Sequence, residues 1–183
     1  MSAIHEHVLQ NGMTLLCWPQ RHLHGLEFGL YLKGGPLYET EETQGISNLL
    51  EHLCFRGLGG LNREGLLREL NRFGTNLDAA TYAEGLVFRL KCLPRFFDAA
   101  LEYFLRFFAN VPWTPEQIAA EKQVVLRQLE ADGDGDLFDR AACDFRKTEN
   151  GAFPPLGTLE SLMALTEADI QLWQAMIFQP QNA

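Results

Sequence analysis

The sequence predicts an α+β domain in which helices cover one face of a mainly antiparallel sheet. Segments with strand character come in pairs joined by short turns, helical segments also come in pairs, and the two kinds do not alternate strictly along the chain. Short turns require antiparallel neighbours, whereas strict alternation favours a parallel sheet. The chain, residues 1–183, is long enough for a single domain with one hydrophobic core.

The strands are predicted from alternating side chains and from the turns between them. Asn11-Gly12 is typical of a two-residue hairpin turn, so the segments on either side are expected to pair. Residues 26–33 alternate apolar with other side chains, which is the period of a strand with one buried face. Gly34-Gly35-Pro36 ends that strand. The predicted strands are residues 7–10, 13–18, 26–33, 75–82 and 86–93.

The helices are predicted from apolar spacing and from the residues at their ends. Asn62 is expected to cap one helix and Gly74 to close it. Thr114, followed by Pro115 and Gln117, has the pattern of a capping box with proline at the first helical position. The predicted helices are residues 44–56, 63–72, 94–110, 115–131 and 137–147, and a last one that begins after Thr166 and reaches Phe178.

The composition is that of an ordinary soluble globular protein, with 46% hydrophobic residues, 21% charged residues and a formal net charge of −9. A chain this acidic is unsuited to nucleic acids, whose phosphates must be met by clustered Lys and Arg. Charged residues interrupt the apolar stretches, so no membrane-spanning segment is expected. The N-terminus does not resemble a signal peptide, which favours a cytoplasmic location. The 4 widely spaced cysteines are expected to be buried free thiols.

The segment with the clearest chemistry is Asn48-Leu49-Leu50-Glu51-His52. A metal-dependent peptidase needs three protein ligands, an open position for water, and a base that takes the proton of that water. On a helix, His52 could bind a metal while Glu51, about 100° away, faces the bound water. A second ligand belongs one turn earlier, where histidine would complete the inverted zinc signature His-x-x-Glu-His. The chain has Asn48 there, a neutral amide that binds zinc weakly.

Motifs along most of the chain resemble the pitrilysin/insulinase family of zinc metallopeptidases, which includes insulin-degrading enzyme and the mitochondrial processing peptidases. Several stretches match the family in the same order, and together they imply a mitochondrial-processing-peptidase-like half-domain. The matching stretches are Gly35–Glu39, Gly45–Gly57, Asn76–Thr81, Glu121–Leu126 and Pro155–Ser161.

The resemblance implies a role for each site position. The general base falls on Glu51, the second zinc histidine on His52, and a helper carboxylate on Glu121. The first zinc ligand falls on Asn48. The third falls on Gln128, seven residues after Glu121 and therefore on the same face of its helix.

Neutral amides thus stand at two of the three zinc-ligand positions, Asn48 and Gln128. Zinc prefers imidazole, thiolate and carboxylate ligands, so the site is expected to be degenerate and to hold no cofactor, or zinc only if it is functional. Without the metal, Glu51 has no acidified water to act on. Glu130 lies about 200° around the helix from Gln128 and is not expected to replace the missing carboxylate.

The resemblance also implies a peptide-binding edge. In the family an extended peptide binds along an edge strand beside the metal, and that strand corresponds here to residues 75–82. The small residues Ala79, Ala80 and Thr81 either leave room for a guest chain or merely pack under a loop. Phe178–Asn182 resembles a run that leads into a further strand and helices in relatives, so the chain is expected to be the truncated N-terminal portion of the family domain.

Three functions are compatible with the sequence. The main prediction is the non-catalytic half of a two-part peptidase, which binds or encloses a peptide or protein substrate next to a homologous peptidase subunit or domain. The alternatives are an active zinc endopeptidase with unusual or partner-supplied ligands, and a structural or assembly module. Self-association is also expected, because an unpaired sheet edge recruits further strands.

Overall fold

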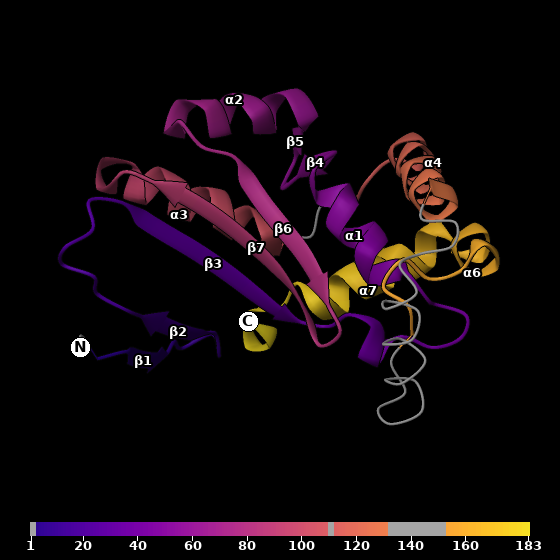
Figure 1. Ribbon diagram of the computed structural model, residues 1–183, viewed down its shortest axis with the longest axis horizontal. Helices are drawn as coiled ribbons and strands as arrows, with labels where there is room; N and C mark the ends of the chain where they lie inside the picture. Colours follow the sequence, from indigo (N-terminus) through magenta and orange to yellow (C-terminus); the bar gives the residue numbers. More distant parts are fainter. Residues whose placement is uncertain (1–2, 110–111, 132–152) are drawn as a thin grey trace.

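The computed structural model describes residues 3–109, 112–131 and 153–183. Its centre is a three-stranded antiparallel sheet in the order β3-β7-β6 (Figure 1). A separate hairpin joins β1 to β2, and a shorter one joins β4 to β5. The strands are β1 (His5–Val8), β2 (Thr14–Cys17), β3 (Leu26–Lys33), β4 (Gly57–Leu58), β5 (Leu61–Asn62), β6 (Leu77–Tyr82) and β7 (Gly85–Cys92).

Alternation along the central strands divides the sheet into a covered and an open face. Leu30 and Leu32 of β3 lie opposite Phe88 and Leu86 of β7, and all four are buried. Tyr31, between the two leucines, points to the other face and is exposed. Helix α3 contacts β3 and β7, and helix α1 contacts β6. The predicted α+β class, with helices on one face of an antiparallel sheet, is therefore confirmed.

The helices begin and end largely at the residues expected to cap them. Asn62 accepts a hydrogen bond from the Gly65 N–H, and Gly74 closes the same helix in the left-handed conformation at φ 66°. Thr114 and Gln117 form the predicted reciprocal cap. The α-helices are α1 (Ile46–Cys54), α2 (Arg63–Phe73), α3 (Phe97–Leu105), α4 (Pro115–Ala131), α6 (Leu159–Ala164) and α7 (Glu167–Ile177), and the 3₁₀ turns are η1 (Pro36–Tyr38), η2 (Pro94–Phe96), η3 (Arg106–Ala109) and η4 (Pro180–Asn182).

Several sequence predictions need correction. The first hairpin turns through residues 9–13 rather than through Asn11-Gly12 alone, because β1 ends at Val8 and β2 begins at Thr14. The predicted helix 94–110 is broken into η2, α3 and η3, and the short helix α6 was not predicted. The predicted helix 137–147 lies outside the described residues. Cys17 is exposed rather than buried, Cys54 and Cys92 are buried as expected, and Cys143 lies outside the described residues.

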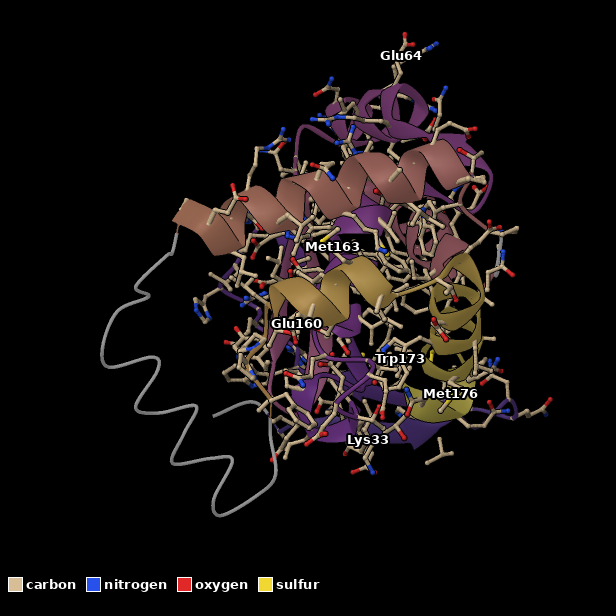
Figure 2. All side chains as sticks on the ribbon, turned by 90° about the vertical axis from the view of Figure 1, so that its right-hand side faces the viewer. Lys33, Glu64, Glu160, Met163, Trp173 and Met176 are labelled. Carbon is tan, nitrogen blue, oxygen red and sulfur yellow. The ribbon has the colours of Figure 1, made fainter. Side chains whose placement is uncertain are left out.

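The core fills the space between the sheet and the helices that contact it. The rings of Phe88 on β7 and Phe107 in η3 lie 4.4 Å apart, and Phe178 packs edge-on against both. Figure 2 shows the side of the molecule formed by α6 and α7, where Trp173 is buried whereas Met163 and Met176 are exposed. In the described residues, no helix combines the length and the apolar character that crossing a membrane requires.

Candidate functional site

A buried carboxylate holds the N-terminus of α1, the helix that carries Glu51 and His52. Glu39 accepts hydrogen bonds from the backbone N–H groups of Gly45 at 2.8 Å and Ser47 at 3.0 Å. These first N–H groups have no partner inside the helix, and the helix dipole favours a negative charge beside them. Burial raises the pKa of Glu39, while the hydrogen bonds from Ser47 and Gly45 act in the opposite direction.

Further contacts tie α1 to the C-terminal helix α7 and to the chain before it. The Ser47 hydroxyl accepts hydrogen bonds from the Gly35 N–H and from the Trp173 indole N–H, both at 3.1 Å. Gly45, at φ 83°, must be glycine, because a Cβ there would lie 2.6 Å from the carbonyl oxygen of Leu156. The helix is thus fixed in position by residues outside its Glu-His pair.

Glu51 points toward the sheet edge. The residue is 9% exposed, and its carboxylate accepts a hydrogen bond of 2.5 Å from the Thr81 hydroxyl on β6. Burial raises the pKa of Glu51, and the hydrogen bond from Thr81 and the neighbouring His52 partly oppose that shift. The predicted base therefore lies directly beside the predicted peptide strand.

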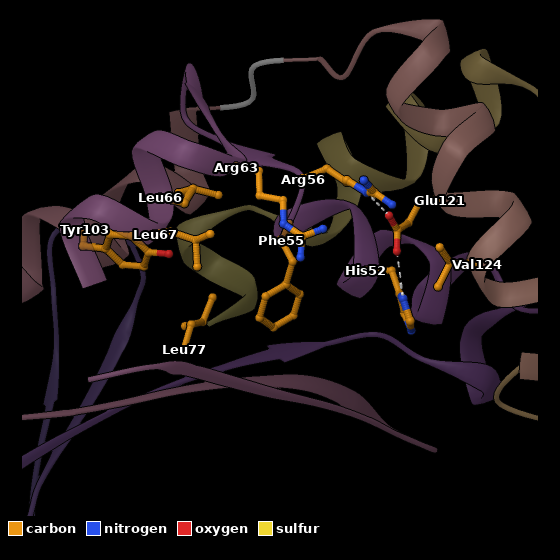
Figure 3. Close-up of a pocket in the computed structure, with 11 residues that line it drawn as sticks. His52, Phe55, Arg56, Arg63, Leu66, Leu67, Leu77, Tyr103, Glu121 and Val124 are labelled. Carbon is orange, nitrogen blue, oxygen red and sulfur yellow. Dashed lines mark hydrogen bonds and ion pairs between the residues drawn. The ribbon is translucent and has the colours of Figure 1, made fainter. Parts of the chain in front are cut away.

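His52 points toward α4 instead. Its Nδ1 lies 3.1 Å from Glu121 Oε1, and the Arg56 guanidinium pairs with the other oxygen of Glu121 (Figure 3). Glu121 is 5% exposed. Burial alone would raise the pKa of Glu121, but the hydrogen bonds from His52 and Arg56 outweigh it, and the pKa is lowered. The contact engages Nδ1 and leaves Nε2 as the ring nitrogen for a further partner.

The two amide positions differ in their surroundings. The Asn48 side-chain oxygen is buried and has no hydrogen-bond partner among the described residues. Gln128 and Glu130, farther along α4, are exposed, whereas Glu121 two turns earlier is buried. Helical spacing places Glu121 and Gln128 on the same side, but only the first reaches the interior.

These residues do not fit a zinc ion. The ligand set would be one imidazole, from His52, with the neutral amides of Asn48 and Gln128, and zinc selects imidazole, thiolate and carboxylate. The carboxylate that contacts His52, that of Glu121, is already held by His52 and Arg56. Within the part of the chain that the structure describes, no three His, Cys, Asp or Glu side chains are grouped so that they could hold a metal.

The predicted peptide strand is an edge strand. β6 begins at Leu77 rather than at residue 75, pairs with β7 on one side, and has no strand on its other side in the described residues. Ala79, Ala80 and Thr81 are half-buried. Ala79 and Thr81 lie opposite the buried Phe88 and Leu86, so they belong to the covered face, whereas Ala80 belongs to the open face.

A cavity of about 350 Å³ lies next to His52, between α1, α2 and α4 (Figure 3). Its walls are largely apolar, and the charged side chains of Arg56 and Glu121 line it next to His52. The lining residues include His52, Phe55, Arg56, Arg63, Leu66, Leu67, Leu77, Tyr103 and Glu121. Sequence reasoning missed Arg56 and Arg63, although Arg56 follows His52 by one helical turn and that spacing was a usable signal.

Comparison with known proteins identifies the family. The model of the insulinase family, peptidase family M16, matches residues 24–142. The chain therefore belongs to this family, which confirms the resemblance found in the motifs. A zinc protease of Rickettsia felis, itself uncharacterized, is 28% identical over 87% of this chain and 39% of its own length. The mitochondrial-processing peptidase subunit beta of Caenorhabditis elegans is 27% identical over 78% of this chain and 32% of its own length.

Solved structures of low sequence identity share the fold. A Helicobacter pylori protease superposes with a TM-score of 0.87 at 21% identity, covering 99% of this chain and 45% of the other. A Pseudomonas fluorescens domain described as an inactive peptidase M16 domain has a TM-score of 0.81 at 17% identity, covering 94% and 43%. The chain thus spans less than half the length of these relatives.

Proposed function

We propose that this domain is the non-catalytic half of a two-part M16 peptidase and binds an extended peptide along β6 without hydrolysing it. The observation that carries the proposal is the ligand set. Asn48 and Gln128 replace two ligands, and the retained His52 is paired with Glu121 rather than grouped with other ligands. A single imidazole with two amides neither holds zinc tightly nor acidifies a water.

The features needed for peptide binding are independent of the metal. The open edge of β6 offers backbone groups for strand addition, which gives affinity without regard to sequence. The small side chains of Ala79 and Ala80 leave space beside that edge. The cavity next to His52 can take one apolar side chain of the bound peptide.

A homologous active subunit or domain is the partner that this function requires. The Pseudomonas fluorescens relative is described as an inactive domain, and another structural relative is described as the first half of an Escherichia coli periplasmic protease, PqqL. Both descriptions support a division of M16 proteins into halves, one of which can be inactive. A peptide or protein substrate would then be enclosed between the two.

Metal analysis combined with peptide binding tests the proposal. Protein purified in the presence of zinc and then desalted should retain far less than one zinc per chain. Fluorescence anisotropy should nevertheless detect the binding of a fluorescently labelled, extended peptide to this protein. His52→Ala is the matched control for metal binding. One zinc per chain in the wild type, lost in His52→Ala, would show that the site is a working metal centre.

The intact Glu51, His52 and Glu121 favour one rival, an active peptidase that completes its ligand set with a partner. Peptide cleavage by the domain mixed with an active homologous subunit, compared with the same mixture containing Glu51→Gln, separates the two functions. Under the proposal, Glu51→Gln leaves the cleavage rate unchanged. A rate that falls with Glu51→Gln would establish the rival.

A further inference from the structure

We propose, building on the peptide binding proposed above, that a basic trough at the Leu77 end of β6 binds acidic residues of the peptide. The trough is defined by two neighbouring cavities of about 620 and 280 Å³ that share Glu27 and Lys91. The larger lies between the start of β3, the end of α2 and the segment that joins β7 to α3. The smaller lies on the open face of the sheet.

The larger cavity combines an apolar wall with cationic groups. Phe73 and Phe96 line it, with ring centroids 6.1 Å apart. The Arg95 guanidinium lies 4.8 Å from the centroid of the Phe96 ring, and no ion pair among the described residues includes Arg95. A guanidinium held against an aromatic face keeps its N–H donors available for a carboxylate. Arg72 lines the same cavity, where it pairs with Glu69 on its own helix.

The smaller cavity contains an arginine with an unsatisfied donor. Arg89 Nε is buried and has no hydrogen-bond acceptor among the described residues. The nearest carboxylate, that of Asp78, lies 3.6 Å from this atom, beyond hydrogen-bond distance. A buried N–H without an acceptor is unfavourable, and a carboxylate oxygen is the strongest acceptor a peptide can supply.

The charge of the trough is opposite to that of the chain. Arg72, Arg89, Lys91 and Arg95 line the two cavities together with the carboxylates of Glu27 and Asp78, while the whole chain carries 24 acidic against 15 basic residues. Lys91 pairs with Glu27 and Arg89 pairs with Asp78, each at 3.6 Å, so the positive excess of the trough comes from Arg72 and Arg95. Charge complementarity therefore selects an acidic segment and disfavours a basic one.

The trough lies within reach of a peptide bound at the edge strand. Thr81, which contacts Glu51, is five residues from Asn76, which lines the smaller cavity. At about 3.3 Å per residue, an extended chain covers that separation in about 17 Å. A peptide paired with β6 beside Glu51 thus brings residues about four to six positions away, on one side only, to the smaller cavity of the trough.

Labelled peptides that differ only in this segment test the proposal. Extended decapeptides with two glutamates four and six positions from an apolar anchor should bind about tenfold more tightly than the same peptides with glutamines, the scale of one charge-assisted hydrogen bond. The double variant Arg89→Gln, Arg95→Gln should remove this preference and leave the affinity for the glutamine peptide unchanged. Arg68→Gln is the matched control, because Arg68 is an exposed arginine of α2 outside the trough that pairs with Glu64, and it should retain the full preference.

The results separate this proposal from the proposed function. Equal binding of glutamate and glutamine peptides by the wild type would overturn the trough and leave peptide binding intact, whereas absence of binding by either peptide would overturn both. A preference that survives in the double variant would also overturn the trough, with far-UV circular dichroism verifying that this variant is folded. Hexanoate serves as a small organic anion in a competition experiment. If it binds as tightly as the glutamate peptide and displaces that peptide, the trough is a site for small organic anions instead.

Discussion

Replacing Glu39 by alanine should destabilise the whole domain, because this carboxylate satisfies the first N–H groups of α1. The change leaves the Gly45 and Ser47 N–H groups buried without an acceptor, since both residues are buried in the fold. Each unsatisfied buried donor costs about 1–3 kcal/mol. Removal of the carboxylate also removes its own desolvation penalty, so we expect a net loss of about 2–4 kcal/mol, a large share of the 5–15 kcal/mol typical of a folded domain.

Urea unfolding monitored by tryptophan fluorescence measures this loss. Trp113 and Trp173 are 5% and 8% exposed, so their emission should change on unfolding. The slope of the unfolding free energy against urea should stay as in the wild type, which shows that only stability has changed. Glu42→Ala is the matched control, because Glu42 is exposed and lies in the same loop, and it should stay close to the wild type. A loss for Glu39→Ala no larger than for Glu42→Ala would refute the capping role.

Three further outcomes follow from the same contacts. Burial raises the pKa of Glu39 in the fold, so its carboxyl contributes most to stability below the unfolded value of about 4.3 and less as the pH rises through the folded pKa. The stability of the wild type relative to Glu39→Gln should therefore decrease as the pH rises above about 4.3, and an increase would contradict the raised pKa. Thr81→Val removes the hydrogen bond to Glu51 and should lower the unfolding free energy by about 1–2 kcal/mol. Thr81→Ser keeps the hydroxyl and should stay near the wild type. Equal losses in the two variants would show that the hydroxyl is unimportant. The double change Asn48→His, Gln128→Glu should raise zinc affinity by more than about 100-fold over either single change, since even outer-shell changes alter metal affinity 10–100-fold. Competition with a chelator measures this affinity. Equal affinities in the single and double variants would count against Asn48 and Gln128 as ligand positions.

Local signals predicted much of the fold, because they act over a few residues. The alternation in Leu26–Lys33 gave the bounds of β3, and Asn62 and Gly74 bracket α2 as their capping chemistry requires. Helix α6 escaped prediction because it spans only six residues and its capping box uses Ser161 instead of the usual Glu or Gln. The strands β4 and β5 lie in a glycine-rich stretch that indicates only the end of a helix.

The candidate site likewise has features that local sequence patterns predict and features that they do not. The adjacency of Glu51 and His52 and the amide at position 48 are visible in the sequence. The spacing of Arg56 from His52 indicates that Arg56 lies near the site, but its pairing with Glu121 joins residues 65 apart and cannot be read from any local pattern. Helical spacing puts Gln128 on the face of Glu121, but whether that face is still covered two turns later depends on what α4 packs against. The capping role of Glu39 likewise depends on a contact that only the folded chain creates.

The residues that hold α1 in place are different from those at the zinc-ligand positions of the family. Glu39, Ser47 and Trp173 hold the helix, and none of them occupies a zinc-ligand position. An ancestor with a complete ligand set could therefore lose its metal through changes at positions 48 and 128 and still present the same helix beside the same sheet edge. In such a lineage, selection for binding alone preserves the scaffold while the zinc-ligand positions change. The helix is then kept although the reaction that it once served is lost.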